Sequence, residues 1–272
     1  MSDLKITVVT PSFNQGPFLE QTLRSVHDQG HPHVEHVVID GGSSDESIEI
    51  LERWSDRLDY WVSEPDAGQT DALIKGFGHA TGDILCWLNS DDMFEAWTLH
   101  EVATFFETHP DAQVVYGDAT RIDAEGRRLH TKKEHPFHRF IFMYDHDFIP
   151  QPSTFWRREL YERVGGLNPA FDLAMDADLF IRFADVTRIH HVRRPWSRMR
   201  LYPEQKNQRL RLRSNFEDGL IRDRYFGSQP RWVIRSKRAA ARGMRIVWKL
   251  MTGCYTRADV NWWMSRVFER EL

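Results

Sequence analysis

The stretch Gly82-Asp-Ile-Leu-Cys-Trp-Leu-Asn-Ser-Asp-Asp-Met93 places a cluster of polar side chains directly after an apolar run. The run 84–88 is typical of a strand buried on both faces of a sheet. Ligands of open α/β sheets bind beyond the carboxyl ends of the strands, and oxygen-rich side chains there suit a hard cation such as Mg²⁺ or Mn²⁺. A second interpretation is that Asp91 and Asp92 cap a helix that begins near Glu95. The stretch alone leaves both open.

The sequence on either side of this stretch alternates between strand and helix patterns. Runs of β-branched and apolar residues predict strands at 5–10, 36–40, 60–63, 84–88 and 112–116. Helical spacing predicts helices at 18–29, 43–54, 72–79 and 99–108, the second opened by a Ser43/Glu46 capping box. This alternation indicates an α/β fold with a mostly parallel sheet flanked by helices. Asn14, Asp40 and the 89–92 cluster each follow a predicted strand, so we expect them at one sheet edge, which favours a binding site over isolated caps.

Bulk properties fit a globular protein of one large domain or of a domain with an appendage. The chain has 272 residues, of which 41% are hydrophobic and 28% charged, and only two cysteines, so a reducing, cytoplasmic compartment is expected. No secretory leader and no apolar run near 20 residues is present. Residues 205–272 hold 16 basic and 6 acidic side chains, whereas residues 1–204 hold 20 and 34. This asymmetry predicts an interaction tail or a tail that packs on the acidic half.

Three motifs, in order, carry a family resemblance. They are Val-Val-Thr-Pro-Ser-Phe-Asn-Gln-Gly16, Val-Val-Ile-Asp-Gly-Gly-Ser-Ser-Asp45 and the stretch 82–92, with Asp66-Ala-Gly-Gln-Thr-Asp71 between them. Over about residues 5–205 the chain resembles the family 2 glycosyltransferases. That resemblance implies a GT-A (Rossmann-like) fold and an inverting transfer of a sugar from a nucleotide-diphosphate donor, expected to be UDP-linked.

The resemblance also implies a donor site. It assigns the nucleoside to Pro11, Ser12, Phe13, Asn14 and Asp40, and the nucleotide and diphosphate side to Gln69, Asp71, Lys75, Asn89, Ser90 and Asp91. The triplet 89–91 stands in the place of an Asp-x-Asp motif, so Asp91 is the expected ligand of Mn²⁺ or Mg²⁺. Asn89 departs from the pattern and removes one formal charge.

The acceptor half is expected to supply a general base. The stretch Met175-Asp-Ala-Asp-Leu-Phe-Ile-Arg182 opens a predicted helix, where the helix dipole stabilises an anion. The family's base maps to Asp176, which would take the proton of the acceptor hydroxyl; the alternative is that Asp176 and Asp178 only cap the helix. Gln151, Ser153 and Trp156 are predicted sugar contacts, with ordinary core as the alternative for Trp156. Tyr202 stands where relatives often carry a histidine, so no histidine ligand is expected.

The C-terminal stretch 231–249 has seven basic residues, no acidic one, and two tryptophans. A basic amphipathic helix of this kind is typical of contact with an anionic membrane surface. Packing on the acidic catalytic half is an equal alternative. Nucleic-acid binding is disfavoured because no recognition motif accompanies the basic run.

These observations predict a nucleotide-sugar-binding half at 1–115, an acceptor and catalytic half at 116–204, and a helical basic extension at 205–272. The expected function is an inverting glycosyltransferase for a bacterial surface polysaccharide or glycolipid, acting in the cytoplasm or peripherally at the membrane. The alternatives are a sugar nucleotidyltransferase, although the loop at 11–15 lacks the glycines and basic residue expected of one, and a catalytically silent nucleotide-sugar-binding protein, which Asn89 and Met175 suggest.

Overall fold

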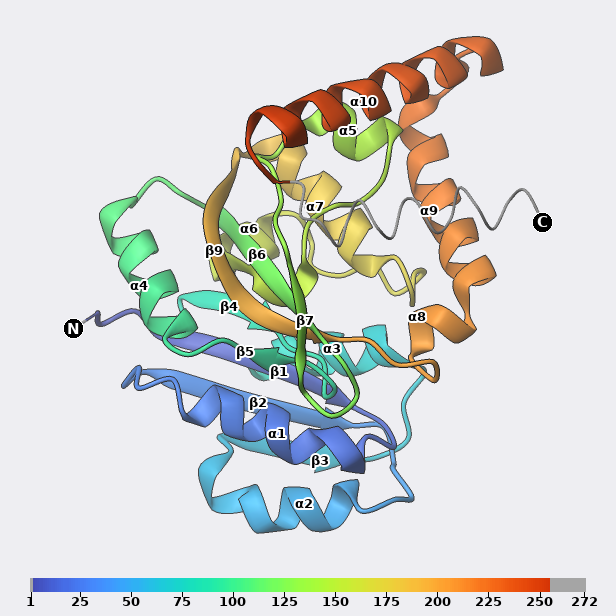
Figure 1. The fold of residues 1–272 in the computed structure, drawn as a ribbon. Coiled ribbons are helices and arrows are strands. Elements are labelled where there is room, and N and C mark those ends of the chain that lie inside the picture. Colours follow the sequence, from blue (N-terminus) through green and yellow to red (C-terminus); the bar gives the residue numbers. More distant parts are fainter. Residues whose placement is uncertain (1, 255–272) are drawn as a thin grey trace.

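The computed structural model describes residues 2–254 and builds them around one nine-stranded sheet (Figure 1). The sheet order is β3-β2-β1-β4-β8-β6-β9-β5, with β7 paired to β6. The strands are β1 (Ile6–Ser12), β2 (Val34–Asp40), β3 (Tyr60–Ser63), β4 (Ile84–Trp87), β5 (Met93–Phe94), β6 (Val114–Ile122), β7 (Arg128–Lys132), β8 (Thr154–Arg157) and β9 (Ile189–Arg200). The α-helices are α1 (Gly16–His27), α2 (Ser47–Trp54), α3 (Gln69–His79), α4 (Thr98–Thr108), α5 (Arg139–Tyr144), α6 (Arg158–Arg163), α7 (Met175–Val186), α8 (Lys206–Arg209), α9 (Arg211–Phe226) and α10 (Arg231–Met251).

Four neighbouring strands, β3, β2, β1 and β4, run parallel, as the alternating pattern predicted. Asn14, Asp40 and the 89–92 cluster therefore follow strands that end at the same sheet edge. Beyond β4 the sheet changes direction, because β8 is antiparallel to both β4 and β6. The polar edge thus lies beside the place where the parallel and the mixed part of the sheet meet.

Helices cover both faces of the sheet because alternate strand residues point to opposite sides. On one face, Ile84, Cys86 and Leu88 pack in a cluster with residues of α4, and on the other, Leu85 and Trp87 pack with residues of α3 and α7. The close approach of α3 to β1 depends on Gly76, where an added Cβ would lie 2.4 Å from Cγ1 of Val9. Packing of this kind, rather than helix propensity, fixes the position of α3.

Neither of the two helix caps that the sequence suggested is formed, the alternative cap at residues 91–92 and the expected capping box at Ser43 and Glu46. Helix α4 begins at Thr98, and Asp92 instead accepts a hydrogen bond from the backbone N–H of Arg200 (2.9 Å), so the 89–92 cluster does not cap it. Helix α2 begins at Ser47 without a side-chain cap, because the Ser43 hydroxyl donates to Asp40 (2.6 Å). Asp92 and Ser43 thus make hydrogen bonds at the polar sheet edge and do not cap helices.

Three element boundaries differ from the prediction. Pro11 and Ser12 belong to β1 rather than to a loop, and α3 begins at Gln69 rather than near Ala72. Strand β6 continues past the predicted end at residue 116 to Ile122 and forms a hairpin with β7 through a turn at 123–127, where the Asp123 backbone N–H donates to the Arg127 carbonyl (3.0 Å). The short helix α5 had no sequence signal.

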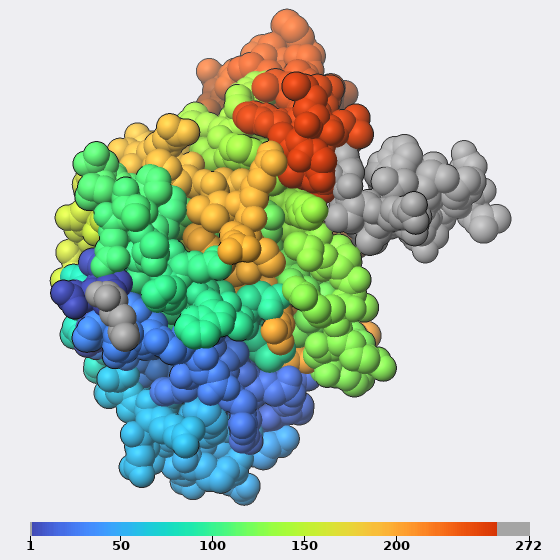
Figure 2. Space-filling model, turned by 60° about the vertical axis from the view of Figure 1, so that its left-hand side comes forward, coloured from blue at the N-terminus to red at the C-terminus, as the bar shows by residue number. Residues whose placement is uncertain are grey.

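The C-terminal helices lie against the second half of the sheet domain, with α10 over α5 (Figure 2). The inner face of α10 reaches a buried ion-pair group in which Glu134 contacts Lys249 (3.0 Å) and Lys132 (3.1 Å). Arg245 also pairs with Asp145. The stretch 231–249 therefore does pack on the domain, through charge as well as apolar contact. Residues 255–272 of the predicted extension lie outside the described part.

No helix within residues 2–254 combines the length and the apolar character that a membrane crossing requires.

Candidate active site

A cavity of about 930 Å³ opens at the polar sheet edge. Its wall combines the ends of β1 and β4, the start of α3, the turn before α7 and the segment after β9. The lining residues include Pro11, Ser12, Phe13, Asn14, Gln15, Gly41, Asp66, Gly68, Gln69, Asn89, Ser90, Asp91, Gln151, Asp172, Met175, Asp176, Tyr202, Lys206, Arg209 and Leu210. Most of the predicted donor-site residues therefore meet in one place.

One side of the cavity, formed by residues 11–14, is a loop held by hydrogen bonds to the loop after β2. Asn14 adopts a left-handed backbone (φ 51), its amide N–H donates to the Ser43 hydroxyl (2.7 Å), and its side-chain oxygen accepts from Ser44 N–H (2.9 Å). Asp40 is fully buried and accepts from Ser43 and from the hydroxyl of Ser63 (2.7 Å). Asp40 thus organises the two loops and is absent from the cavity wall.

A chain of polar contacts crosses the cavity from β4 to the segment after β9. The Gln69 amide donates to the side-chain oxygen of Asn89 (2.8 Å), and Lys206 Nζ lies 3.4 Å from the Gln69 oxygen. Lys206 also pairs with Asp172 (3.0 Å). The Asn89 side chain therefore belongs to a polar network that also contains the Lys206 ammonium and the Asp172 carboxylate.

Asp91 lies in the wall with little exposed surface and accepts a hydrogen bond from the Tyr202 hydroxyl (2.9 Å). Burial raises the pKa of Asp91 and outweighs the opposing effect of this bond. Burial also raises the pKa of Asp92 well above its ordinary value, and the negative charge of Asp91 adds to that rise. Arg200 lies behind both and donates to the backbone carbonyl of Asp91 (2.9 Å). A cation or donated proton here would relieve the repulsion between the two carboxylates.

The residues fit a cation that is shared with a substrate. Within the described chain no group of three or more His, Cys, Asp or Glu side chains is placed to hold a metal. Mg²⁺, however, commonly binds through one or two carboxylates together with substrate phosphates. Asp91 supplies one such carboxylate in the cavity wall.

Asp176 lies in the first turn of α7 and lines the same cavity. Its Oδ1 accepts the backbone N–H of Ala177 (2.9 Å). Burial raises the pKa of Asp176 to about 6. Asp147 lies near enough for its own pKa to be raised, first by burial and then by the charge of Asp176. A carboxylate with a pKa near 6 is ionised at neutral pH and is still basic enough to accept a proton.

Two acidic residues near Asp176, Asp178 and Glu217, have structural roles. Glu217 was not identified from the sequence. Asp178 forms an ion pair with Arg182 (2.7 Å), whose guanidinium also donates to the carbonyl of Gly166. Buried Glu217 of α9 accepts from the backbone N–H groups of Leu173 (2.8 Å) and Ala174 (3.2 Å), at the turn that precedes Asp176. Glu217 could have been noticed only as an acidic residue in a basic tail.

Asp71 and Lys75 lie outside the cavity wall. They form an ion pair with each other (3.3 Å), and Lys75 also contacts Glu64 (3.1 Å). Asp71 in addition accepts the N–H of Ala67 (3.1 Å), which holds the loop before α3. In this structure the pair therefore supports the wall rather than forming it.

The predicted acceptor contacts divide into one that lines the cavity and two that do not. The Gln151 amide donates to the carbonyl of Trp87 (2.8 Å) and the side chain faces the cavity. Trp156 is fully buried among Trp87, Phe77 and other aromatic rings, so it offers no face to a sugar. Ser153 is also buried, where its hydroxyl contacts Ser197 (2.6 Å). The structure contradicts the sugar contacts expected of Trp156 and Ser153.

Comparison with known sequences identifies the family. The profile described as "Glycosyl transferase family 2" matches residues 7–165. An uncharacterized glycosyltransferase of Mycobacterium tuberculosis is 31% identical over 182 residues, which cover 66% of this chain and 68% of that relative. A PGL/p-HBAD biosynthesis glycosyltransferase of Mycobacterium bovis is 30% identical over 194 residues, 68% of this chain and 73% of the relative.

Solved structures show the same fold. The Staphylococcus aureus TarS fragment 1–349 with UDP aligns with a TM-score of 0.65 and 17% identity, covering 96% of this chain and 78% of the fragment. A mannosyltransferase of Pyrobaculum calidifontis, in complex with GDP-Man and Mn²⁺, aligns with a TM-score of 0.62 and 18% identity, covering 99% and 81%. The match to a longer TarS chain covers only 39% of it. The fold is therefore the GT-A fold, and the chain belongs to glycosyl transferase family 2 as an enzyme of that family.

Proposed function

We propose that this family 2 glycosyltransferase moves a sugar from a nucleotide-diphosphate donor to an acceptor hydroxyl with inversion at the anomeric carbon. The observation that supports this most is that Asp91 and Asp176 line one cavity. One carboxylate suits the diphosphate end of a donor, and the other suits the hydroxyl of an acceptor. Inversion needs those two functions to act on opposite sides of the anomeric carbon.

In the proposed mechanism, Asp176 accepts the proton of the acceptor hydroxyl as that oxygen attacks the anomeric carbon. Its pKa of about 6 suits this task at neutral pH. Asp91 would hold Mn²⁺ or Mg²⁺, which when bound neutralises charge on the departing diphosphate. Lys206, which lines the cavity, provides a second positive charge near the Gln69–Asn89 contact. Glu217 keeps the turn before Asp176 in place.

The nucleoside would occupy the part of the cavity formed by residues 11–14, with Gly41 at its edge. Asp40 would act indirectly, through the loop that it holds. The donor is expected to be UDP-linked, and the TarS fragment that this fold resembles was solved with UDP-GlcNAc. Gln151 is the remaining candidate for acceptor contact.

The expected product is a bacterial surface glycolipid or polysaccharide. One relative is named for PGL/p-HBAD biosynthesis, which supports a glycolipid. We also propose that stretch 231–249 touches an anionic membrane surface at its cytoplasmic face. Helix α10 buries one side against the domain, while Trp232, Val247 and Leu250 are exposed on another. Such a helix has the character of an interfacial element.

Nucleotide release from a panel of nucleoside-diphosphate sugars, with and without Mn²⁺ and glycoside acceptors, tests this function. Release that rises when acceptor is added supports a transferase. Pyrophosphate exchange with a nucleoside triphosphate would instead indicate a sugar nucleotidyltransferase. Thermal stabilisation by the donor without turnover on any acceptor would favour a silent binding protein.

A further inference from the structure

Helix α9 carries an exposed apolar stripe that none of the functions described so far uses. Leu212, Phe216 and Leu220 recur every four residues and so lie on one face of the helix, with 87%, 65% and 44% of their surfaces exposed. Exposed large apolar side chains that gather on one face mark an interaction site. The opposite face of α9 is buried against the domain through Ile221 and Glu217.

The stripe begins at the mouth of the cavity. Arg209 and Leu210, directly before α9, line the cavity, and Leu210 is itself partly exposed. From there α9 runs to the start of α10, where Trp232 is exposed (Figure 1). Apolar surface is therefore available beside the cavity and again at the far end of the same helix.

The charge around the stripe points to an anionic partner. Residues 205–220, which contain the stripe, hold Lys206, Arg209, Arg211 and Arg213, against two acidic side chains that are both paired: buried Glu217 with Arg213 and Asp218 with Arg222. Next along the chain, α10 adds exposed Arg231, Arg235 and Arg238. Apolar side chains flanked by arginines are typical of helices that lie at a lipid–water interface, where basic residues are attracted to anionic lipid.

Helix α9 is also bonded to residues 171–174, the turn that precedes Asp176. Glu217 holds the backbone N–H groups of residues 172–174, and Arg224 lies over the ring of Phe171 at 5.0 Å. A surface that binds the outer face of α9 is consequently held at a constant distance from Asp176.

We propose that the stripe Leu212–Phe216–Leu220 binds the surface of an anionic lipid bilayer and so holds the cavity mouth at the lipid headgroups. The acceptor is then a sugar or hydroxyl carried by a membrane lipid. This inference rests on the proposed transferase function for the identity of the acceptor, whereas bilayer binding itself does not depend on catalysis.

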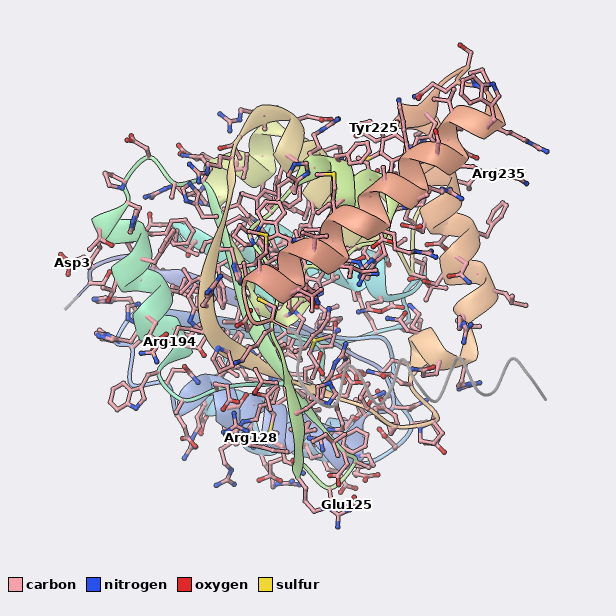
Figure 3. The ribbon with its side chains drawn as sticks, turned by 45° about the horizontal axis from the view of Figure 1, so that its top comes forward. Asp3, Glu125, Arg128, Arg194, Tyr225 and Arg235 are labelled. Atoms are coloured by element: carbon pink, nitrogen blue, oxygen red, sulfur yellow. The ribbon has the colours of Figure 1, made fainter. Side chains whose placement is uncertain are left out.

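The first test is flotation of the whole protein with vesicles of 30% phosphatidylglycerol in phosphatidylcholine. Replacing two apolar side chains in L212Q/F216Q should weaken vesicle affinity about tenfold or more. The matched control is Leu129→Gln, a leucine with 53% exposure on β7 and so on a different element from α9 and α10; its neighbour Arg128 is labelled at the hairpin in Figure 3. Equal flotation of L212Q/F216Q and the wild type, or no flotation of the wild type, would overturn the proposal.

A second measurement locates the contact. An environment-sensitive fluorophore on Phe216→Cys should shift its emission to the blue when the vesicles are added, and on Leu129→Cys it should not. The native Cys86 and Cys254 are buried, which limits background labelling. If the protein floats with the vesicles while the label at position 216 stays unchanged, the contact is made by α10 alone and the proposal fails. The proposal also fails if the label at 216 responds to an added protein partner but not to vesicles.

Nucleotide release from the donor separates this inference from the function on which it rests. L212Q/F216Q should release nucleotide in solution at the wild-type rate, because neither side chain lines the cavity. If the wild type releases none, the transferase function fails while the vesicle result still decides the bilayer contact.

Discussion

The strand-end cavity and the attachment of α10 both bury acidic side chains, but with opposite electrostatic results. Burial raises the pKa of Asp176 to about 6, because few opposing charges are near it. Burial alone would also raise the pKa of Glu134, but Lys132 and Lys249 more than offset it and lower the pKa to about 2. The first carboxylate is kept able to take a proton, and the second is kept permanently charged as a structural contact. The direction of the pKa shift therefore distinguishes a carboxylate suited to proton transfer from one that holds the fold together.

The largest expected effect comes from Asp176→Asn. An amide cannot accept the acceptor proton, so we expect transfer to fall by about 10³ or more while donor affinity stays within a few fold. Steady-state transfer and donor titration of the same protein measure both. Asp185→Asn, on the outer part of the same helix, is the matched control and should stay active. Substantial transfer by Asp176→Asn would remove it from the role of base.

Asp91→Ala tests the other carboxylate of the cavity. Loss of the expected cation ligand should lower metal-dependent donor affinity by about 10², measured by titration with and without Mn²⁺. Asp56→Ala, at an exposed position after α2, should leave the metal response intact. If Asp91→Ala and the wild type respond equally to Mn²⁺, Asp91 is not the ligand.

Glu134→Gln tests whether the buried ion pairs of Glu134 attach α10 to the domain. Buried Lys249 and partly exposed Lys132 lose their partner, so we expect a loss of about 3 kcal/mol in the free energy of unfolding, with little change in donor affinity. Urea unfolding measures this, and Glu125→Gln in the exposed β6–β7 turn should change stability by less than about 0.5 kcal/mol. Wild-type stability in Glu134→Gln would mean that the ion pairs do not hold α10.

Catalytic activity and folding stability should depend on pH in different ranges, which can be measured on the wild-type protein. The raised pKa of Asp176 means that its basic form is lost as the pH falls through about 6, so transfer should drop roughly tenfold per unit below that value. The stability that Glu134 contributes is present above its unfolded pKa of 4.5 and is lost as the pH falls toward about 2. Activity should therefore fail at a higher pH than the fold. A transfer rate that stays flat from pH 7 to pH 5 would contradict the assignment of Asp176.

Much of the donor half was predictable because its signals are local. An unbroken apolar run such as 84–88, bounded by polar turn residues, is typical of a buried strand, and the alternation with helical periods indicates parallel pairing. That pairing alone brings Asn14, Asp40 and residues 89–92 to one edge. Asp176 could be placed at a helix start for the same reason, from the spacing of apolar residues after it.

What the side chains do at that edge depended on tertiary contacts. Ser43 resembles a helix cap in sequence, but its hydroxyl donates to Asp40 (2.6 Å) instead. Trp156 was a predicted stacking surface for a sugar, but in the fold the rings of Trp87 and Phe77 pack against it.

The sequence by itself indicated the parallel direction of the first four strands, the polar edge and the family, because period and motif are properties of neighbouring residues. Only the tertiary structure decided that Tyr202 reaches Asp91, that Glu217 holds the turn before Asp176, and that Glu134 anchors α10. Each of these contacts joins residues more than 40 positions apart, and the energy of a buried charge depends on which groups surround it in space.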